Sequence, residues 1–404
     1  MSTCCILGLG YIGLPTAALL AKVGHRVFGV DINPDVVNIV NDGNVHIIEP
    51  DLEQSVADGV SSGNLSAQLF PCSADIFIIT VPTPFDTSHN SIPQPNIEFV
   101  LTAVQSIAPY LLPGNLVLLE STSPVGTTEQ VCVLLEEISG LTKDQLSIAY
   151  CPERVLPGRI LSELVNNDRV IGGLTYSASQ HARRFYSTFC DGELYLTDSR
   201  TAELVKLAEN SFRDVNIAFA NELSIICHEL DIDISNMIRL ANHHPRVNIL
   251  QPGCGVGGHC IAVDPWFIAS ALPNSTPLIQ AARLVNDQKS LWVVQQVKSR
   301  ADSLASQLER PVQIGLLGIT FKPDVDDLRQ SPALNIVSEI ISSGLNVLVC
   351  EPNLVSHPDF RLYSIDSVLA NADLLVFLVA HTDFKRLRLL DRPILDFCGV
   401  TNIV

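Results

Sequence analysis

The 404-residue sequence contains few charged residues, and most of those are acidic. Charged residues make up 17% of the chain, and 25 lysines and arginines stand against 43 aspartates and glutamates, which gives a formal net charge of −18. This balance argues against a general nucleic-acid-binding or membrane-surface protein. Apolar residues make up 47%, which excludes disorder as the main state. At roughly 150 residues per domain, the length indicates two or three domains.

The sequence also lacks long uncharged apolar runs. None reaches the roughly 18 residues of a membrane span, and the opening residues MSTCCILGLG lack the pattern of a secretion signal. The eleven cysteines are irregularly spaced. We therefore expect a cytoplasmic protein with reduced thiols rather than disulfides.

Short apolar strands alternate with amphipathic helices at both ends of the chain. In the first part of the chain, the pattern predicts a helix at about 12–23 and strands at 4–8, 25–31, 74–81, 114–121 and 146–150. In the last part of the chain, the pattern predicts a helix at 332–343 and strands at 313–319, 346–352 and 373–380. This alternation indicates mostly parallel sheets that are covered on both faces.

The middle of the chain has a helical pattern instead. Residues 198–230 contain no Gly or Pro and keep helical periodicity, which predicts one helix of about 45 Å at 199–230 with Ser199 as its N-cap. A Gly-rich loop follows at 252–258, and then more helix to about residue 310. We expect an α/β fold of two Rossmann-like parallel-sheet domains joined by a central helical region. The predicted domains are 1–196, 197–310 and 311–404.

A glycine fingerprint, Gly8-Leu9-Gly10-Tyr11-Ile12-Gly13, follows the first predicted strand and opens the first helix. Gly8 permits a tight turn, Gly10 lets a pyrophosphate approach the backbone, and Gly13 lets the helix pack on the strand. The glycines alone are compatible with a plain turn. Asp31, at the end of the next strand, can accept hydrogen bonds from a ribose diol, and no Arg follows it. The pattern therefore predicts a dinucleotide site that prefers NAD to NADP.

Two threonines follow later strands of the same predicted sheet. Thr83 lies in VPTP and Thr122 lies in ESTSPVG. Ligands of open α/β sheets bind at the carboxyl ends of the strands, so both threonines are candidate contacts for the dinucleotide. The alternative is that they only form turns.

The segment at 251–267, QPGCGVGGHCIAVDPWF, has the highest density of residues that could take part in catalysis or ligand binding. Its glycines, Gly257 among them, let the backbone approach a ligand closely. If a helical turn starts near Gly258, Cys260 lies at the positive end of that turn, which favours the thiolate. Asp264, four residues later, then lies on the same face as Cys260. A buried structural cysteine is the alternative. Cys254, His259 and Cys260 have no second ligand pair at metal spacing, so no metal site is expected.

Other polar residues could bind an anion. Lys206, Asn210 and Arg213 share one stripe of the long helix, although an exposed polar face would give the same spacing. Further candidates lie in short motifs elsewhere: Glu153 and Arg154 in YCPERVLPG, His244 and Arg246 in HHPRV, and Lys322 and Arg329 in FKPDVDDLRQ.

The motifs GLGYIGLP, ESTSPVGTT, YCPERVLPG, AELVKLAENSFRDVNIAFANE, HPRVNILQPGCGVGGHCIAVDPWF and FKPDVDDLRQSP occur in this order. In these motifs the chain resembles the UDP-sugar 6-dehydrogenase family, and within it the bacterial branch that acts on UDP-N-acetyl-D-mannosamine. One departure is Cys254, where relatives usually have Pro.

The resemblance implies roles for the candidate residues. It implies that Cys260 is the nucleophile, with Lys206, Asn210 and Asp264 around it, and that Thr122 and Glu153 belong to the catalytic water network. It implies NAD contacts from Tyr11, Ile12, Asp31, Thr83, Thr122 and Arg329. It implies substrate contacts from Arg154, Val155, Lys206, Asn210, Arg213, His244, Arg246, Gly257 and Lys322.

The resemblance also implies a four-electron oxidation of a sugar C6 alcohol to a carboxylate, for envelope polysaccharide synthesis. The expected cofactor is NAD and the expected intermediate is a thioester on Cys260. UDP-N-acetylglucosamine and UDP-glucose are alternative substrates, and a two-electron hydroxyacid-type dehydrogenase or a non-enzymatic NAD sensor are alternative functions.

The long helix further suggests a homodimer. Its apolar stripe, which includes Leu204, Leu207, Ile217 and Leu223, is expected to pack against a symmetry mate. The resemblance implies that Arg246 reaches the sugar site of the partner. The alternative is that the stripe packs within one chain and that Arg246 is a surface charge.

Overall fold

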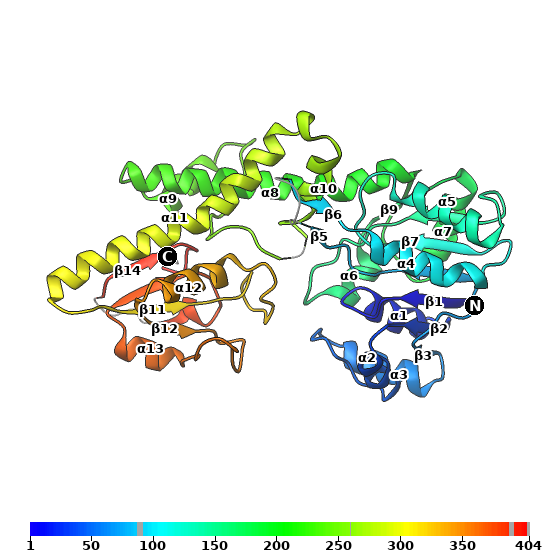
Figure 1. The fold of residues 1–404 in the computed structure, drawn as a ribbon, viewed down its shortest axis with the longest axis horizontal. Helices are drawn as coiled ribbons and strands as arrows, with labels where there is room; N and C mark the ends of the chain where they lie inside the picture. The colour runs from blue at the N-terminus through cyan, green and yellow to red at the C-terminus, as the bar shows by residue number, and fades with distance from the viewer. Residues whose placement is uncertain (87–91, 259, 388–391, 402–404) are drawn as a thin grey trace. The chain divides into compact units, whose positions relative to one another are not determined.

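The computed structural model describes residues 1–86, 92–258, 260–387 and 392–401 (Figure 1). The chain falls into two compact units, one of residues 1–208 and 266–271 and one of residues 209–265 and 272–404. The division falls within two helices, α8 (Ser199–Glu229) and α10 (Asp264–Ala271).

The first unit is built on an eight-stranded sheet with the strand order β10-β9-β8-β7-β4-β1-β2-β3. The strands are β1 (Thr3–Leu7), β2 (Arg26–Val30), β3 (Leu65–Gln68), β4 (Ile76–Ile79), β7 (Leu116–Leu119), β8 (Ser147–Tyr150), β9 (Arg169–Gly173) and β10 (Leu194–Asp198). Neighbouring strands are parallel except β8 and β9. The order of strands β1 to β8 is that of a dinucleotide-binding fold, and it reverses between β1 and β4.

Helices cover both faces of this sheet. One face packs on α1 (Gly13–Lys22), α2 (Pro34–Asn41), α3 (Leu52–Ser61), α6 (Ile160–Asn166) and α7 (Tyr176–Tyr186), and the other packs on α4 (Glu98–Ile107) and α5 (Thr127–Ser139). Successive side chains of a strand point to opposite faces, so Cys4 and Ile6 enter the first core while Cys5 and Leu7 enter the second. A two-stranded pair, β5 (Phe85–Asp86) and β6 (Gln94–Pro95), lies apart from the main sheet.

The second unit contains a parallel sheet with the order β12-β11-β13-β14. Its strands are β11 (Gln313–Leu317), β12 (Asn346–Cys350), β13 (Leu374–Phe377) and β14 (Ile394–Asp396). α11 (Pro277–Leu308) and α12 (Pro332–Ser342) pack on one face and α13 (Ile365–Asn371) packs on the other. α9 (Ile234–Ala241) belongs to the same unit.

The predicted fold class is confirmed, since both ends of the chain form sheets that are mainly parallel and the long helix is a single element of 31 residues. The predicted N-cap is wrong. Ser199 is already helical, and Asp198 accepts a hydrogen bond from the backbone N–H of Thr201 at 2.9 Å. The division into three domains stays a prediction, because the structure groups the central helix α11 with the C-terminal sheet in one core.

All eleven cysteines lie within the described ranges, and all are free thiols. Cys260 is one of three that are half-buried, with Cys72 and Cys398. None of the helices that the structure describes combines the length and the apolar character needed to cross a membrane.

Candidate functional site

The turn between β1 and α1 has the shape that a dinucleotide requires. Gly8 has a φ of +91°, and a Cβ on Gly13 would lie 1.8 Å from the carbonyl oxygen of Gly8, so only glycine fits there. A Cβ on Gly10 would meet nothing within 4 Å, which leaves the backbone open to a ligand. No side chain caps α1, so its first N–H groups are available to phosphate oxygens. These features fit a bound pyrophosphate.

Asp31 lies beside this turn. Its carboxylate accepts the N–H of Leu9 at 3.0 Å and the N–H of Asn33 at 2.9 Å. Thr80, which follows β4, donates its hydroxyl to the carbonyl of Gly8 at 2.8 Å. The ends of β1, β2 and β4 therefore meet where the strand order reverses, which is the position for ligands in such sheets.

Thr83 and Thr122 also meet at this edge. The hydroxyl of Thr83 donates to the carbonyl oxygen of Thr122 at 2.6 Å, and both residues are half-buried. The structure thus brings together two predicted NAD contacts from loops that follow β4 and β7. Their contact with the cofactor stays a prediction.

Glu153 is buried in an ion pair that the sequence did not reveal. Its Oε2 lies 3.0 Å from Nη1 of Arg169, and its Oε1 accepts the N–H of Arg154 at 2.8 Å. The guanidinium of Arg154 donates to the carbonyl of Asp168. Arg169 is the first residue of β9 and belongs to none of the motifs, so sequence reasoning missed it.

A second buried carboxyl group, Glu120, lies near this pair. Burial is the largest effect on Glu120 and raises its pKa to about 7. The charge of Arg169 lowers this pKa, and the charge of Glu153 raises it. Tyr186 donates its hydroxyl to Oε1 of Glu120 at 2.6 Å, and the guanidinium of Arg169 lies 4.8 Å from the centre of the Tyr186 ring. Glu120 therefore changes its charge near neutral pH.

The loop that carries Arg154 and Val155 is fixed by a residue far away in the sequence. Both carboxylate oxygens of Glu49 accept from its backbone, from Gly158 at 2.8 Å and from Ile160 at 2.7 Å. Val155 packs against the first core. These contacts tie the loop to the first unit.

In the second unit, the Gly-rich loop packs against the segment between β11 and α12. The N–H of Gly258 donates to the carbonyl of Arg329 at 3.1 Å. Gly258 has a φ of +82°, and a Cβ there would lie 2.9 Å from the ring of Phe321. This contact requires glycine.

The other end of the Gly-rich loop is tied to α8 and α11. The N–H of Gly253 donates to Oδ1 of Asn221 at 2.9 Å, and the hydroxyl of Ser290 donates to the carbonyl of Cys254 at 2.8 Å. The loop is thus anchored on both sides before it reaches Cys260.

The anchor continues into a buried polar network between the two helices. Asn221 donates to Asn286 at 2.9 Å, Asn286 donates to Asp214 at 2.8 Å, and Arg283 forms a 2.7 Å ion pair with Asp214. Burial raises the pKa of Asp214, although Arg283 lowers it. Sequence reasoning missed these residues because buried partners on two helices share no short motif.

Cys260 lies at the start of a helical turn, as expected. Its carbonyl accepts the N–H groups of Val263 at 3.0 Å and Asp264 at 2.8 Å, just before α10. Cys254 has a different environment, because its buried thiol donates to the carbonyl of Leu378 at 3.4 Å. Burial raises the pKa of Cys254 to about 12, so it does not offer a competing thiolate. His259 lies outside the described residues.

The structure brings together Asn210 and Asp264. The side-chain amide of Asn210 donates to Oδ2 of Asp264 at 2.5 Å, and both side chains are buried. Lys206, one turn earlier on α8, is buried as well, so the alternative of an exposed polar face is wrong for Lys206 and Asn210. Arg213 is exposed.

The remaining candidates lie on loops of the second unit. Lys322 is half-buried, and Arg329 is exposed and paired with Asp327 at 2.6 Å. His244 and Arg246 are both exposed after α9, where Nδ1 of His244 accepts the N–H of Arg246 at 3.3 Å.

Three family models match successive parts of the chain. The NAD binding domain of the UDP-glucose/GDP-mannose dehydrogenase family matches residues 2–190, its central domain matches 200–288, and its UDP binding domain matches 315–402. The chain belongs to this family. It is therefore an oxidoreductase with an NAD-binding domain and a UDP-binding domain, as expected from its motifs.

Individual relatives agree over nearly the whole chain. The UDP-N-acetyl-D-mannosamine dehydrogenase of Campylobacter jejuni is 49% identical over 98% of each chain. The NDP-N-acetyl-D-galactosaminuronic acid dehydrogenase of Ralstonia nicotianae is 48% identical over 98% of this chain and 96% of its own. A solved structure of the UDP-N-acetyl-mannosamine dehydrogenase of Staphylococcus aureus is 38% identical over all of both chains, with a TM-score of 0.89.

Proposed function

We propose that this family member oxidises C6 of UDP-N-acetyl-D-mannosamine to a carboxylate, in a four-electron reaction that passes through a thioester on Cys260. The observation that carries the proposal is the hydrogen-bonded pair of Asn210 and Asp264 next to the helical turn that begins at Cys260. An amide donor, a buried carboxylate and a thiol at a positive helix end are the groups that acyl chemistry at sulfur requires.

The cofactor fits the turn that follows β1, where Gly8, Gly10 and the start of α1 would hold its pyrophosphate and Asp31 its ribose diol. NAD⁺, when bound, accepts the hydride that C6 loses in each of the two oxidations. Lys206, or a water held by Asp264, removes the proton of the C6 hydroxyl in the first oxidation.

Cys260 then adds to the aldehyde. A carbon–sulfur bond forms as the carbonyl π bond opens onto oxygen, and Lys206 and Asn210 stabilise the negative charge on that oxygen. Oxidation of this thiohemiacetal leaves a thioester. The covalent bond keeps a reactive aldehyde from leaving between the two oxidations.

Hydrolysis completes the reaction. Water attacks the thioester carbonyl, the carbon–sulfur bond breaks, and the thiolate of Cys260 is regenerated with release of the carboxylate. We assign the positioning of this water to Glu153, with Thr122 in the same network. The ion pair with Arg169 holds the Glu153 side chain in one place, which supports that role.

The choice of sugar rests on the relatives, since UDP-N-acetyl-mannosamine is the substrate in the names of the Campylobacter jejuni and Staphylococcus aureus proteins. The Ralstonia nicotianae relative, which is named for an N-acetylgalactosaminuronic acid, makes a second N-acetylhexosamine worth testing. A panel of UDP-sugars with NAD⁺ should give the highest kcat/KM for UDP-N-acetyl-D-mannosamine. A higher value for UDP-N-acetylglucosamine, UDP-N-acetylgalactosamine or UDP-glucose would overturn the assignment.

We further propose a cytoplasmic role, because NAD and UDP-sugars are cytoplasmic metabolites, and a place in the synthesis of envelope polysaccharide precursors. A uronate product suits that role because it adds negative charge to a polysaccharide. A deletion strain should lose the uronic acid from its envelope polysaccharide and regain it with a plasmid copy of the gene. An unchanged polysaccharide would contradict this role.

We also propose a homodimer. Phe212, Phe219 and Ile226 recur every seven residues on α8 and are 70%, 54% and 41% exposed, so they form one apolar stripe. The stripe expected from the sequence was partly wrong, because Leu207 is fully buried. A symmetry mate would cover the exposed stripe.

Arg246 is proposed to act on the sugar site of the partner. Its exposure supports this role, since nothing buries it within the described part of its own chain. Mixed dimers of Cys260→Ala with Arg246→Ala should recover about a quarter of wild-type activity, because about half of the dimers are mixed and each has one intact site. No recovery after verified subunit exchange would show that Arg246 acts within its own chain.

A further inference from the structure

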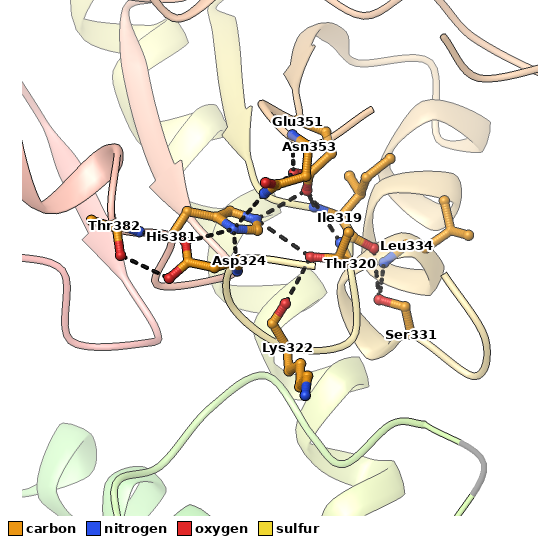
Figure 2. A network of polar contacts seen from close by, with 10 residues as sticks. All are labelled: Ile319, Thr320, Lys322, Asp324, Ser331, Leu334, Glu351, Asn353, His381 and Thr382. Atoms are coloured by element: carbon orange, nitrogen blue, oxygen red, sulfur yellow. Dashed lines mark hydrogen bonds and ion pairs between the residues drawn. The ribbon is translucent and has the colours of Figure 1, made fainter. Parts of the chain in front are cut away.

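A buried polar cluster lies at the carboxyl ends of three strands of the second sheet (Figure 2). Thr320 comes after β11, Glu351 directly follows β12 and His381 comes after β13, and all three are buried. Because β11 lies between β12 and β13, the strand order reverses beside β11. Ligands of open parallel sheets bind at such a reversal, so the cluster is placed beside a ligand position.

The hydrogen bonds fix the proton on His381. Its Nδ1 accepts the backbone N–H of Asp324 at 3.0 Å, and the side-chain amide of Asn353 lies 3.0 Å from the same nitrogen. A backbone N–H only donates, so Nδ1 carries a lone pair. Nε2 lies 3.1 Å from Oε2 of Glu351 and donates to it. These contacts place a ring proton on Nε2.

Glu351 joins His381 to the backbone of the loop after β11. Its Oε2 also accepts the N–H groups of Ile319 at 2.8 Å and Thr320 at 3.3 Å. Burial raises the pKa of Glu351, but the hydrogen bonds from His381 and from the backbone N–H groups of Ile319 and Asn353 outweigh it and hold the pKa below its ordinary value. The cluster thus keeps a carboxylate that accepts several donors at once.

The loop that this cluster holds is the one that carries Lys322. On one side of Lys322, the hydroxyl of Thr320 donates to its carbonyl at 2.9 Å. On the other side, Asp324 has a left-handed φ of +59°, and its carboxylate accepts the N–H of Thr382 at 2.9 Å. Figure 2 shows the Lys322 side chain extending away from the buried cluster. The backbone is pinned on both sides of Lys322, and its ammonium nitrogen lies 5.8 Å from the centre of the Phe321 ring.

The same loop supports the Gly-rich segment before Cys260. Phe321 touches Gly258, and a Cβ on Gly257 would lie 2.5 Å from the carbonyl oxygen of Gln330. The two segments are therefore closely packed. A displacement of the Lys322 loop would therefore also displace the Gly-rich loop.

We propose that His381 is a positioning residue for the nucleotide sugar: it fixes the backbone from which Lys322 reaches the ligand and against which the Gly-rich loop packs. The inference rests on the proposed function and on the substrate contact that the family resemblance implies for Lys322. His381 itself contacts protein groups on both ring nitrogens and acts through Lys322.

UDP binding to the full-length protein, measured by calorimetry, tests the proposal without any need for turnover. His381→Leu removes both hydrogen bonds and should raise the Kd for UDP by about tenfold or more. His381→Asn keeps an acceptor close to the position of Nδ1 and should stay within about threefold of wild type. The Kd for NAD⁺ should change in neither variant, because its site lies in the first unit.

A matched control is available in the same unit. Like His381, His357 accepts a backbone N–H at Nδ1, in this case from Asp359 at 3.3 Å. The loop that contains His357 carries none of the candidate site residues. His357→Leu should bind UDP like wild type. Glu351→Gln serves as a second test that preserves side-chain shape, and it should weaken UDP binding about threefold or more with NAD⁺ binding unchanged.

The outcomes separate the possibilities. Equal UDP affinity in wild type, His381→Leu and Glu351→Gln would overturn the proposal, as would a parallel loss of UDP and NAD⁺ binding, which indicates general unfolding. The predicted contrast in UDP affinity, found in a protein that oxidises no UDP-sugar, would support the positioning role and refute the proposed function alone.

Discussion

The side-chain amide of Asn210 on α8 donates a 2.5 Å hydrogen bond to the buried carboxylate of Asp264, the first residue of α10. The two residues are separated by 54 positions in the sequence. Asp264 is also joined to Cys260 through the turn that precedes α10. The pair is thereby tied to the backbone of Cys260.

Exchange of the two partners separates geometry from charge. Asn210→Asp and Asp264→Asn should each lower kcat by about 100-fold or more, because each removes a group that handles charge at the reacting carbon. The double exchange restores one donor and one acceptor and should recover the Tm but not kcat. Asn216→Asp, farther along α8, is the control. Full activity in the double exchange would show that only the hydrogen bond matters.

Loss of the Cys260 thiol should stop acid formation. Cys260→Ala should produce no carboxylate, and Cys260→Ser should accumulate an ester that intact-mass spectrometry detects, because an alkoxide leaves less readily than a thiolate. Cys72→Ala removes another half-buried thiol and should keep wild-type activity. Normal acid formation by Cys260→Ala would refute the covalent route.

Asp31 should determine the choice of cofactor. Asp31→Ala removes the acceptor for the ribose diol and should raise the KM for NAD⁺ about tenfold or more, with little change in the KM for the UDP-sugar. The wild-type enzyme should use NADP⁺ poorly, since the carboxylate repels a 2′-phosphate. Asp35→Ala, at the start of α2, is the control. Equal activity with NAD⁺ and NADP⁺ would contradict this role.

Glu120 should make stability depend on pH. Its pKa is raised from 4.5 to about 7 by burial, so between these values the folded state binds a proton that the unfolded state has released. The free energy of unfolding should therefore fall as the pH rises from 4.5 to 7, by an amount on the order of 2–3 kcal/mol. Glu120→Gln should lack this fall in urea unfolding at pH 5 and pH 8.

A carboxyl group at the surface provides the control for this measurement. Glu98→Gln, at the exposed start of α4, should retain the wild-type pH dependence. A parallel pH dependence in wild type and Glu120→Gln would mean that Glu120 is ionised in the same way in both states of the chain.

The exposed stripe on α8 should be needed for association. Phe219→Glu places a charge in its centre and should convert the dimer to a monomer in light scattering after size exclusion. Phe70→Glu alters a side chain that is 74% exposed in the first unit and should leave the dimer intact. A monomeric wild type, or a Phe219→Glu variant that remains dimeric, would contradict the proposed interface.

Local patterns in the sequence predicted the fold well. The spacing of Gly8, Gly13 and Asp31 constrains a short βαβ segment, and the structure places all three as expected. The long helix followed from the absence of Gly and Pro. Its N-cap did not, because Asp198 and Ser199 are both good caps and only the geometry decides between them.

The buried partners of the site were not predictable in this way. Arg169, Glu120 and His381 contact residues that are far away in the sequence, and no spacing in the sequence signals such a contact. The pairing of Asn210 with Asp264 has the same origin. Motifs predicted candidate residues for the chemistry, whereas tertiary packing determines which residues orient those candidates.

The most direct test of the central claim is the number of NADH molecules formed for each UDP-N-acetyl-D-mannosamine consumed, read from absorbance with limiting sugar. The account predicts two NADH and a carboxylate product, with no free aldehyde trapped by an added amine. One NADH per sugar with an aldehyde or ketone product would contradict it and would indicate a two-electron dehydrogenase.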